Sequence, residues 1–364
     1  MRIGIDAREL TGKPTGVGRY LASLLSEWAV DDAARRHEFI LYSARPPAVS
    51  LDSHRFAQRT IPGSGGTWWE QITLPRVADA DHLDVWFAPG YTAPLRLAMP
   101  IVIAVHDLSF FAHPEWFTVR EGLRRRFICS RSVAAARAVV TISEFSRREL
   151  IERLGVPAAK IHVIPPAVGS QRSAISRGQP KVLYVGSIFN RRHVTDLVRA
   201  FAPIARAHTD ASLDIVGDDR TYPPENLAAT IAAEGLERQV RWHHYVDDGQ
   251  LRALYASARA FAFLSEYEGL GLTPLEALSA GVPSVLLDTP VARETCGSTA
   301  LYVPPGDVRA TTAALERLLF DENTRATLLA AAVHTLARFR TGRAGRETLA
   351  VIDATIEAFH RQKL

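Results

Sequence analysis

The sequence predicts an α/β protein that carries two doubly wound parallel sheets in tandem. Short β-rich runs alternate with longer amphipathic runs along the whole chain, which is typical of βαβ units. A chain of 364 residues is long enough for two domains with separate cores. A polar, aperiodic stretch at 169–180 divides the alternation into two series, and we interpret it as a linker.

Composition narrows the class of protein. Apolar residues make up 47% and charged residues 23% of the chain, which is the balance of an ordinary globular protein. The formal net charge is +4, but only four of the 43 basic residues are lysines, so we attribute the excess to a general preference for arginine and expect no nucleic-acid partner. Cys129 and Cys296 are the only cysteines, which leaves no disulfide framework and no zinc pattern. The start "MRIGIDAREL" lacks a signal peptide and no apolar run reaches about 18 residues, so we expect a cytoplasmic protein.

Each series contains six expected strands. In the first series we also expect helices at about 17–28, 120–136 and 144–154. The strands of the first series are "RIGID", "EFILY", "DVWFA", "IVIAV", "AVVTI" and "IHVIP", and those of the second are "KVLYVG", "LDIVG", "VRWHHY", "RAFAFL", "PSVLL" and "ALYV". Ligands of open α/β sheets bind beyond the carboxyl ends of the strands, so the residues after each strand are the candidates for function.

Candidate residues follow strands in both halves of the chain. Gly16 and Gly18 come after the first strand and precede a helix, and His106 follows "IVIAV". Arg191 and Arg192 follow "KVLYVG" and are suited to clamp a diphosphate. Alone, each has an ordinary explanation, as turn glycines, a structural histidine or a pair of solvated arginines. Their common position at strand ends favours a ligand site.

Residues 265–283, "SEYEGLGLTPLEALSAGVP", allow two interpretations. In the first, Thr273 caps a helix that begins at Pro274, and Glu276 completes a capping box. Glu268 is then a solvated loop acid, and Gly281 ends the helix.

The second interpretation is a ligand site, and it also accounts for Gly269 and Gly271. Glycines let the backbone approach a ligand, and here they lead into a helix N-terminus whose N–H groups favour an anion. A phosphate at the start of the helix, with Glu268 and Glu276 accepting hydrogen bonds from sugar hydroxyls, explains the whole stretch.

A basic helix is expected within the segment "REGLRRRFICSRSVAAARA". We interpret its arginines as a solvated helix face, and the alternative is a contact with anionic lipid or an anionic acceptor. The arginines are Arg124, Arg125, Arg126 and Arg131.

Several segments together resemble a known family. "EGLGLTPLE" fits an E-x7-E signature, and "TGVGRYLASLL", "VHDLSFFAHPEWF" and "LYVGSIFNRRHVTDLVRAF" are similar to family segments in the expected order. The family is family four of the retaining nucleotide-sugar glycosyltransferases with the GT-B fold. The resemblance covers roughly 1–335 and is greatest to mannosyltransferases of bacterial O-antigen and polysaccharide assembly.

The resemblance implies a GT-B architecture, in which two Rossmann-like doubly wound domains face each other across a cleft. Residues 1–168 form the acceptor domain, 169–180 the linker and 181–340 the nucleotide-sugar donor domain. Residues 341–364 form a C-terminal helix that returns to the first domain. Its apolar positions have helical spacing, at Leu349, Ile352, Ile356 and Phe359.

The resemblance also implies roles for the residues of 265–283. Glu276 hydrogen-bonds the ribose of the nucleotide, and Glu268 contacts hydroxyls of the donor sugar. We favour ribose binding over capping for Glu276, because one side chain cannot easily do both. The diphosphate is held by backbone N–H groups at Gly269, Leu270, Gly271 and Leu272.

Other roles carry over to the strand ends. Arg192 takes the place of the basic diphosphate ligand, and Arg191 that of the basic residue before it. His106 corresponds to the active-site histidine near the donor sugar, so His106, Glu268 and Arg192 are the expected catalytic residues. The remaining expected donor contacts are the turn at Gly16 and Gly18 and the backbone around the base at Tyr245 and Val246.

The sequence departs from the family pattern at three places. Ser187 stands where many members carry an arginine, and His193 replaces a common asparagine or glycine. "IPPAV" replaces the usual "PNGV". These departures concern the identity of the donor and its phosphate contacts.

The resemblance implies a retaining, metal-independent hexosyltransferase that needs no cofactor besides its nucleotide-diphosphate sugar, for which GDP-mannose is the first expectation. The acceptor is a glycan, a lipid-linked or a small molecule, and peripheral contact with the inner membrane is a further expectation. The alternatives are a UDP- or dTDP-sugar-dependent transferase, a non-catalytic nucleotide-sugar binding partner and an epimerase of the same fold.

Overall fold

A computed structural model of the chain describes residues 1–12, 16–49, 51, 54–169 and 179–362. The contacts divide the chain into two units. The first consists of Met1–Ala167 and Arg340–Leu364, and the second is Val168–Phe339. Most of the expected linker, residues 170–178, lies outside the described residues.

The first unit is built on a seven-stranded sheet in which every strand pair is parallel, in the order β3-β2-β1-β4-β5-β6-β7. The strands are β1 (Arg2–Asp6), β2 (Glu38–Ser43), β3 (Phe56–Thr60), β4 (Val85–Ala88), β5 (Ile101–Val105), β6 (Ala138–Thr141) and β7 (Ile161–Val163). All six strands expected in this half are present, and β3 is an additional one. It lies at the sheet edge with a single buried residue, so it lacks the apolar alternation that predicts a strand.

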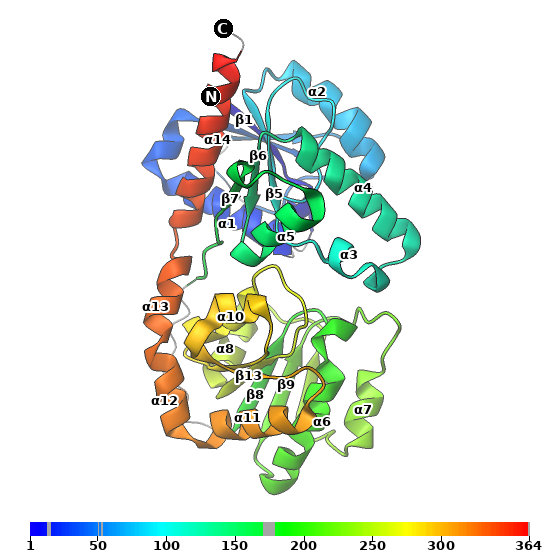
Figure 1. The fold of residues 1–364 in the computed structure, drawn as a ribbon, viewed down its shortest axis with the longest axis vertical. Helices are drawn as coiled ribbons and strands as arrows, with labels where there is room; N and C mark the ends of the chain where they lie inside the picture. The colour runs from blue at the N-terminus through cyan, green and yellow to red at the C-terminus, as the bar shows by residue number, and fades with distance from the viewer. Residues whose placement is uncertain (13–15, 50, 52–53, 170–178, 363–364) are drawn as a thin grey trace. The chain divides into compact units, whose positions relative to one another are not determined.

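Helices cover both faces of this sheet (Figure 1). Alternate residues of β2 enter two separate cores: Phe39 and Leu41 lie in one, and Ile40 and Tyr42 in the other. Helices α1 and α14 contribute to the first core, and α2, α4 and α5 to the second. The helices are α1 (Gly16–Val30), α2 (Leu74–Ala80), α3 (Ser109–Ala112), α4 (Val119–Ala135), α5 (Glu144–Leu154) and α14 (Arg343–Arg361).

The C-terminal helix α14 packs on α1 within the first unit. Leu349, Ile352 and Ile356 are buried in the core, as their helical spacing predicts. The Trp28 Nε1–H donates to the Gly345 carbonyl at 2.8 Å, and the Gly345 N–H donates to Glu27 Oε2 at 2.6 Å. The last segment of the chain is therefore fixed to the first unit by both apolar and polar contacts.

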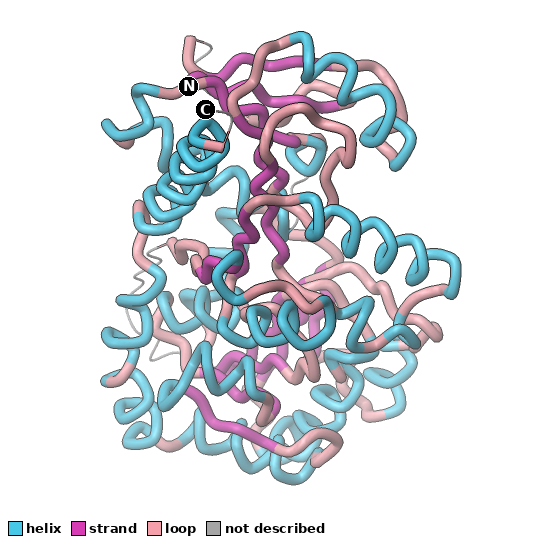
Figure 2. Tube along the Cα trace, turned by 45° about the horizontal axis from the view of Figure 1, so that its top comes forward, coloured by secondary structure: helices cyan, strands magenta, loops and turns pink. Residues whose placement is uncertain are grey.

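The second unit repeats the architecture with six parallel strands in the order β10-β9-β8-β11-β12-β13. The six strands expected from the sequence are all present: β8 (Lys181–Val185), β9 (Ser212–Val216), β10 (Val240–His243), β11 (Ala260–Phe263), β12 (Ser284–Leu287) and β13 (Ala300–Val303). Figure 2 shows the strands of each unit enclosed by helices. In the second unit these are α6 (Val194–Ala207), α7 (Leu227–Ala233), α8 (Asp248–Ser257), α9 (Leu272–Ser279), α10 (Pro290–Cys296), α11 (Val308–Phe320), α12 (Glu322–Ala330) and α13 (Ala332–Leu336).

Both sheets have the strand order 3-2-1-4-5-6 of a Rossmann fold, with one further strand in the first unit. The order reverses between β1 and β4 in the first unit and between β8 and β11 in the second. In such sheets ligands bind beyond the carboxyl ends of the strands at this point. The fold therefore marks the segments after β8 and β11 as the place to look for a site in the second unit.

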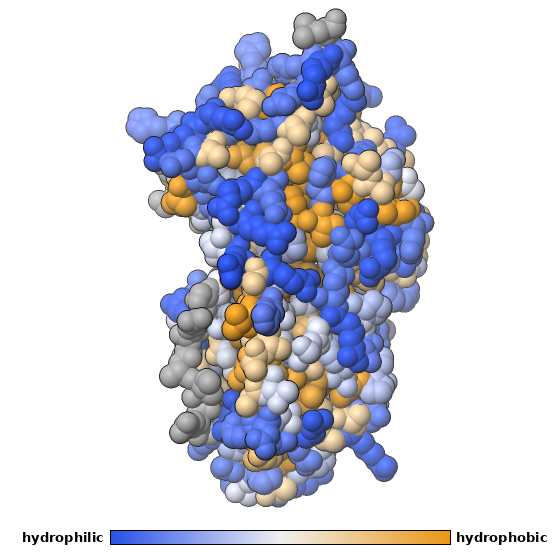
Figure 3. Space-filling model, turned by 60° about the vertical axis from the view of Figure 1, so that its left-hand side comes forward, coloured by the Kyte–Doolittle hydropathy of each residue, from blue (hydrophilic) through white to orange (hydrophobic). Residues whose placement is uncertain are grey.

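The surface is that of an ordinary globular protein on the face drawn in Figure 3, where hydrophilic side chains predominate and apolar ones are interspersed. Among the residues that the structure describes, none of the helices combines the length and apolar composition needed to cross a membrane.

Candidate functional site

An ion pair joins the two strand ends at the reversal point of the second unit. Arg192 ends a short 3-10 turn, Asn190–Arg192, that follows β8, and Glu268 lies in the segment after β11. Arg192 donates to Glu268 Oε1 from Nε at 2.9 Å and from Nη2 at 2.7 Å. The structure thus brings together two residues that the sequence separates by 76 positions.

The surroundings of Arg192 fix its position and its charge. Its Nη1 donates to the Ser187 carbonyl at 2.9 Å, and its guanidinium lies 4.9 Å from the centre of the Phe263 ring. Burial by itself lowers the pKa of Arg192, but the neighbouring Glu268 carboxylate outweighs this and raises the pKa above its usual value. Gly186 (φ +149°) allows the close approach, because a Cβ there would lie 2.8 Å from Nη1 of Arg192. Arg192 is therefore a permanently charged group held at the strand ends.

Ser265 is a functional candidate that sequence reasoning missed. Its hydroxyl donates to Glu268 Oε1 at 2.9 Å, and its side chain is buried. Oε1 thus accepts from both Ser265 and Arg192, whereas no hydrogen bond to Oε2 is found among the described residues. A signal for Ser265 was available, since it comes two residues after the end of β11 and stands three residues before Glu268.

The helix after Glu268 begins earlier than the capping-box interpretation requires. Gly271 is the N-cap, with φ +87°, and α9 begins at Leu272. Thr273 therefore lies inside the first turn and cannot be the N-cap, so the capping-box interpretation is wrong. Gly271 takes the N-cap position because glycine adopts the left-handed conformation without strain. At the other end, Gly281 has φ +80° and its N–H donates to Leu278 O at 3.0 Å, which confirms it as the helix terminator.

Glu276 lies on α9 with a partner from a neighbouring helix. The Tyr255 hydroxyl, on α8, donates to Glu276 Oε2 at 3.1 Å. Tyr255 is fully buried, and Glu276 is partly exposed. The Glu276 carboxylate is therefore positioned in part by Tyr255, and the residue is partly accessible from the protein surface.

The loop that carries Arg191 and Arg192 is tied to the segment before Glu268. The Glu266 N–H donates to the Arg191 carbonyl at 2.9 Å, and the Arg191 guanidinium lies over the Phe189 ring at 4.2 Å. The neighbouring His193 has Nε2 2.8 Å from Glu266 Oε1 and Nδ1 3.2 Å from Asp196 Oδ2. Two parallel connections, one from main chain and one from side chain, therefore hold the two loops together.

His193 adopts the left-handed region, with φ +47°. Glycine and asparagine tolerate this conformation better than other residues. His193, which replaces the asparagine or glycine common in the family, thus occupies a position where the backbone must be left-handed. Its side chain faces the carboxylates of Glu266 and Asp196.

The loop after β10 carries Tyr245 and Val246. Tyr245 is 65% exposed, and Val246 precedes the N-cap of α8, Asp247. Asp247 forms a capping box with Gln250, so the start of α8 is fixed next to this loop.

In the first unit, His106 is brought next to the helix that begins at Gly16. Gly16 is the first residue of α1, and Gly18 is buried in its first turn. Two residues further, the Tyr20 ring packs edge-on against the His106 ring, with centroids 4.5 Å apart. The turn glycines and the histidine are therefore linked through α1.

His106 has a defined protonation state. Burial lowers the pKa of His106 below its usual value, although the Pro89 carbonyl and Asp107 act in the opposite direction. Nε2 lies 2.7 Å from Pro89 O, an acceptor only, so Nε2 carries the proton of the neutral ring. This leaves Nδ1 as a hydrogen-bond acceptor.

A further polar cluster lies at the reversal point of the first unit, and none of its residues was a candidate from the sequence. Arg8 Nη2 lies 2.6 Å from Asp6 Oδ2 and 2.5 Å from Glu70 Oε1, and the Thr92 hydroxyl donates to the same Glu70 oxygen at 2.5 Å. Asp6 and Glu70 are buried. Arg8 therefore links the end of β1 to the helical segment Trp69–Thr73, with one cation shared by two carboxylates.

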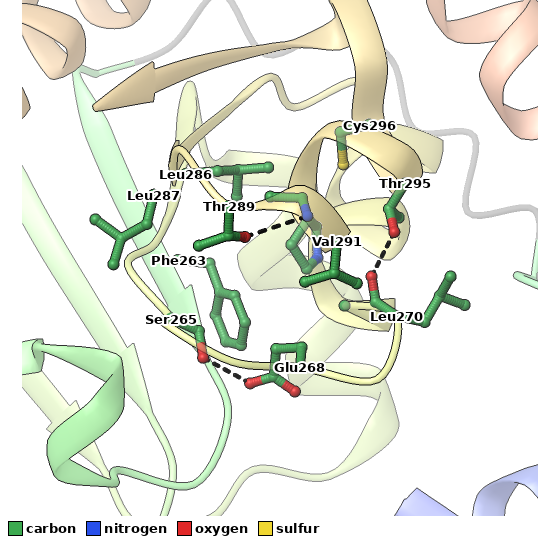
Figure 4. Close-up of a pocket in the computed structure, with 13 residues that line it drawn as sticks. Phe263, Ser265, Glu268, Leu270, Leu286, Leu287, Thr289, Val291, Thr295 and Cys296 are labelled. Atoms are coloured by element: carbon green, nitrogen blue, oxygen red, sulfur yellow. Dashed lines mark hydrogen bonds between the residues drawn. The ribbon is translucent and has the colours of Figure 1, made fainter. Parts of the chain in front are cut away.

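A small, partly open apolar pocket lies beside Glu268. Figure 4 shows Glu268 and Ser265 at its margin, and Phe263, Val291 and Thr289 lining it. The Thr295 hydroxyl donates to the Leu270 carbonyl at 2.6 Å and so connects α10 to the segment before α9. The pocket lies between the segments that follow β11 and β12, next to the candidate ligand-binding carboxylate.

Within the described part of the chain, no group of three or more histidine, cysteine, aspartate or glutamate side chains is placed to hold a metal ion. Cys296 lines the apolar pocket, and burial raises the pKa of its thiol to about 12. Beside Glu268, the positive charge comes from the guanidinium of Arg192.

Two family models match the chain, one on each half. The model described as Glycosyltransferase Family 4 matches residues 14–172, and the model described as glycosyl transferases group 1 matches residues 169–334. Together they span both Rossmann-like units.

Two curated relatives illustrate the similarity. The O-antigen chain mannosyltransferase B of Escherichia coli is 29% identical over 259 residues, which cover 67% of this chain and 68% of that protein. The D-inositol 3-phosphate glycosyltransferase of Kineococcus radiotolerans is 30% identical, and the match covers 96% of this chain and 91% of the relative.

The fold is shared with solved structures. The crystal structure of Anabaena Alr3699/HepE in complex with UDP-glucose has a TM-score of 0.77 at 19% identity, and the match covers 97% of this chain and all of that one. At 19% identity this similarity shows a common fold. The two Rossmann-like units together make up the GT-B fold.

Proposed function

The chain belongs to glycosyltransferase family 4, with the GT-B fold, and from this premise we propose that it transfers a hexosyl unit from a nucleotide-diphosphate sugar with retention at the anomeric carbon. The observation that carries the proposal is the Arg192–Glu268 pair at the strand-order reversal of the second unit. It combines a fixed cation, which suits a diphosphate, with a carboxylate, which suits sugar hydroxyls.

Arg192 can bind the diphosphate without releasing Glu268. A guanidinium has five N–H donors, and three of those of Arg192 are used by Glu268 and the Ser187 carbonyl. The Tyr184 side chain also interacts with the guanidinium, and we propose that the remaining donor capacity of Arg192 serves the phosphate oxygens. The backbone N–H groups at the start of α9, from Gly269 to Leu272, supply further donors to an anion. The site thus favours a diphosphate through charge and through aligned amides.

The two glutamates divide the recognition of the donor. Glu268 keeps Oε2 for a sugar hydroxyl while Arg192 and Ser265 hold Oε1. Glu276, positioned by Tyr255, binds the ribose. Tyr245 and Val246 hold the base through their backbone, and Arg191 adds positive charge beside Arg192.

The proposed reaction needs charge stabilisation at the leaving group. The departing diphosphate takes the proton of the acceptor hydroxyl on the face of the sugar from which it leaves. Arg192 and the amides of α9 stabilise the negative charge that develops there, which is commonly the largest contribution in such sites. His106 presents Nδ1 as an acceptor for a donor-sugar hydroxyl, and Gly16 and Gly18 let the start of α1 approach the phosphates. We propose that these groups suffice without a metal ion or other cofactor.

GDP-mannose is our first choice of donor, supported by similarity to a relative that is named an O-antigen chain mannosyltransferase. The acceptor that fits this choice is a growing glycan or a lipid-linked or small-molecule precursor, used in the cytoplasm at the inner face of the membrane. A UDP- or dTDP-sugar is the second choice, and UDP is favoured by the shared fold with a protein solved with UDP-glucose.

The donor is tested first by thermal shift with GDP, UDP and dTDP, since a nucleotide that binds the folded state raises the melting temperature. The preferred nucleotide sugar is then incubated with and without acceptor, with and without EDTA. We expect acceptor-dependent transfer that EDTA leaves unchanged, with the anomeric configuration of the donor kept in the product by NMR. Conversion of the sugar without acceptor would indicate an epimerase, and binding without turnover a non-catalytic partner; either result contradicts the proposal.

A further inference from the structure

His193 connects the turn that carries Arg192 to the helix α6. It directly follows the 3-10 turn Asn190–Arg192 and is the N-cap of α6. Its N–H donates to the Asn190 carbonyl at 3.0 Å, and its carbonyl accepts from the Leu197 N–H at 3.0 Å. The backbone of His193 is therefore held on both sides, which fixes the direction in which its ring extends.

The imidazole of His193 lies between two carboxylates that belong to different segments. Nε2 is 2.8 Å from Oε1 of Glu266, in the segment after β11, and Nδ1 is 3.2 Å from Oδ2 of Asp196, in the first turn of α6. The other oxygen of Asp196 is 2.7 Å from Nη1 of Arg199, which keeps this carboxylate in place. One partly exposed ring thus links α6 to the segment that leads to Glu268.

Both ring nitrogens of His193 must carry a proton if both contacts are to be hydrogen bonds. An ionised carboxylate offers only acceptors, whereas a neutral imidazole has one N–H donor and one acceptor nitrogen. A neutral ring can therefore bond to Glu266 or to Asp196, and its other nitrogen then faces an oxygen atom with a lone pair. The imidazolium donates to both carboxylates, so the geometry fits the charged ring.

The two arginines that precede His193 are directed to other partners. The guanidinium of Arg191 lies over the Phe189 ring, and that of Arg192 is bonded to Glu268. The charged groups that contact the imidazole are therefore the two carboxylates, one from α6 and one from the segment after β11.

We propose that His193 is a positioning residue of the donor site, and that its charged ring clamps the turn that carries Arg192 to the segment that carries Glu268. His193 directly follows Arg192, and Glu266 stands two residues before Glu268, so the contact between His193 and Glu266 supports the ion pair from both segments. This inference rests on the proposed function, in which Arg192 binds the diphosphate. Loss of the ring proton removes one of the two hydrogen bonds, and the turn is then held less firmly where the diphosphate binds.

The affinity for the nucleoside diphosphate should therefore decrease as the pH rises. Histidine is the side chain that ordinarily exchanges its proton between about pH 5 and 8. The clamp is present at the acid end of this range and is lost toward the alkaline end. His106 has the opposite effect, because its neutral form is the one proposed to act, and it concerns transfer and not the binding of the free nucleotide.

The test is calorimetry of the full chain and of His193→Asn with the nucleoside diphosphate that gives the largest thermal shift. Asparagine suits the left-handed backbone at this position but carries no charge. We expect the variant to bind about fivefold more weakly than the parent at pH of about 5.5 and equally well at pH of about 8.5, an effect within the range for residues in direct contact. The ratio of the two dissociation constants cancels the titration of the phosphate itself.

Glu266→Gln provides a second variant, because it keeps the length of the side chain and removes its charge. It should reproduce the loss of affinity at acid pH, and adding His193→Asn to it should have little further effect. The matched control is His334→Asn, at an exposed position of α13 in the same unit, which should bind the nucleotide like the parent at every pH. Circular dichroism should be the same for all of these proteins.

Nitrogen-15 NMR of the imidazole rings provides a measurement that needs no nucleotide. The signal that is missing in His193→Asn belongs to His193, and at acid pH both of its N–H protons should be protected from exchange with water, since each is in a hydrogen bond. Unprotected ring protons, or the same pH dependence of affinity in the parent and His193→Asn, would overturn the clamp while leaving the proposed function intact. A parent that binds no nucleoside diphosphate at any pH would instead refute the proposed function and, with it, the role of His193 in donor binding.

Discussion

Nη2 of Arg192 lies 2.7 Å from Oε1 of Glu268, and this contact joins the ends of β8 and β11 where the strand order of the second sheet reverses. The two side chains are mostly buried, at 13% and 19% exposure, so the pair is shielded from solvent but open on one side. A ligand at this point meets both charges. Substitution of either residue should therefore also affect the position of the other.

Arg192→Ala should weaken binding of the nucleotide diphosphate and slow transfer. The substitution removes a charge-assisted contact worth about 1.5–3 kcal/mol, or roughly tenfold to a hundredfold in affinity. It also leaves Glu268 without its cation. Arg191→Ala is the matched control and should have a smaller effect, because its guanidinium lies over Phe189. Calorimetry with the nucleotide and steady-state kinetics check this; an Arg192 variant with parental affinity and turnover would return both arginines to the solvated-loop interpretation.

Glu276→Gln and Glu268→Gln should impair the enzyme in different ways. Glu276, as the ribose ligand, is used equally by donor, product and transition state, so its loss should raise the donor KM and weaken nucleotide binding with a smaller change in kcat. In the proposed function Glu268 contacts the sugar and no other part of the donor, so its loss should lower kcat roughly tenfold or more and leave free nucleotide affinity unchanged. Tyr255→Phe, which keeps the packing of α8, should reproduce part of the Glu276 effect. Parental nucleotide affinity in Glu276→Gln would refute the ribose assignment.

Ser265→Ala tests a positioning residue for Glu268. Loss of its hydrogen bond frees Oε1 of Glu268 on one side, and we expect kcat to fall by a few fold, corresponding to about 1 kcal/mol, while KM for the donor changes little. In the Glu268→Gln background the same substitution should have a clearly smaller effect, because residues that act through one another are not additive. Ser265→Thr, which keeps the hydroxyl, serves as the rescue variant. Additive effects in the double variant would show that Ser265 acts independently of Glu268.

His106 should make the protein sensitive to acid. Burial holds the folded-state pKa of His106 below that of the unfolded chain, which is about 6.5. Its neutral form therefore contributes stability that is complete above pH of about 6.5 and is lost as the pH falls toward the folded-state pKa. Transfer should decline at lower pH than stability does, as the pH passes through the lowered folded-state pKa, because only then is Nδ1 protonated and lost as an acceptor in the folded enzyme. Unfolding by urea between pH of about 5 and 8 measures the first effect and initial rates the second.

His106→Ala separates the two roles. It should reduce transfer roughly tenfold to a hundredfold, because a hydrogen bond to the donor sugar is lost, while the free nucleotide, which lacks the sugar, binds as in the parent. The acid-dependent loss of stability should also be smaller than in the parent. A variant with normal turnover and a lower melting temperature would instead mark His106 as a purely structural residue.

His193 tests a backbone requirement beside Arg192. Its φ of +47° suits asparagine but strains a β-branched residue, at a cost of about 1–2 kcal/mol. His193→Asn should therefore retain most of the unfolding free energy, and His193→Val should lose measurably more, in urea denaturation followed by circular dichroism. Equal losses in the two variants would show that the ring contacts with Glu266 and Asp196 matter and the backbone does not.

The series of buried strands, and the position of the candidate residues after them, could be predicted from local sequence patterns. Apolar runs such as "IVIAV" and "RAFAFL" form strands because a parallel strand buried on both faces needs apolar side chains throughout. Gly281 ended its helix as expected, since a left-handed terminator is a local property of glycine. These are features that a few neighbouring residues decide.

Which residues act together depends on how the strands and helices of each unit are arranged in space. Arg192 and Glu268 are separated by 76 positions and meet because the order of the strands brings the ends of β8 and β11 side by side. Asp6 and Glu70 meet through Arg8 because the helical segment Trp69–Thr73 packs near the end of β1. The capping box at Thr273 was a plausible local pattern, but the conformation of Gly271 started α9 earlier. The edge strand β3 and the exposure of large apolar side chains on α4 could not be predicted from the sequence either. Whether a side chain is covered depends on what packs against it in the folded unit and not on its neighbours in the chain.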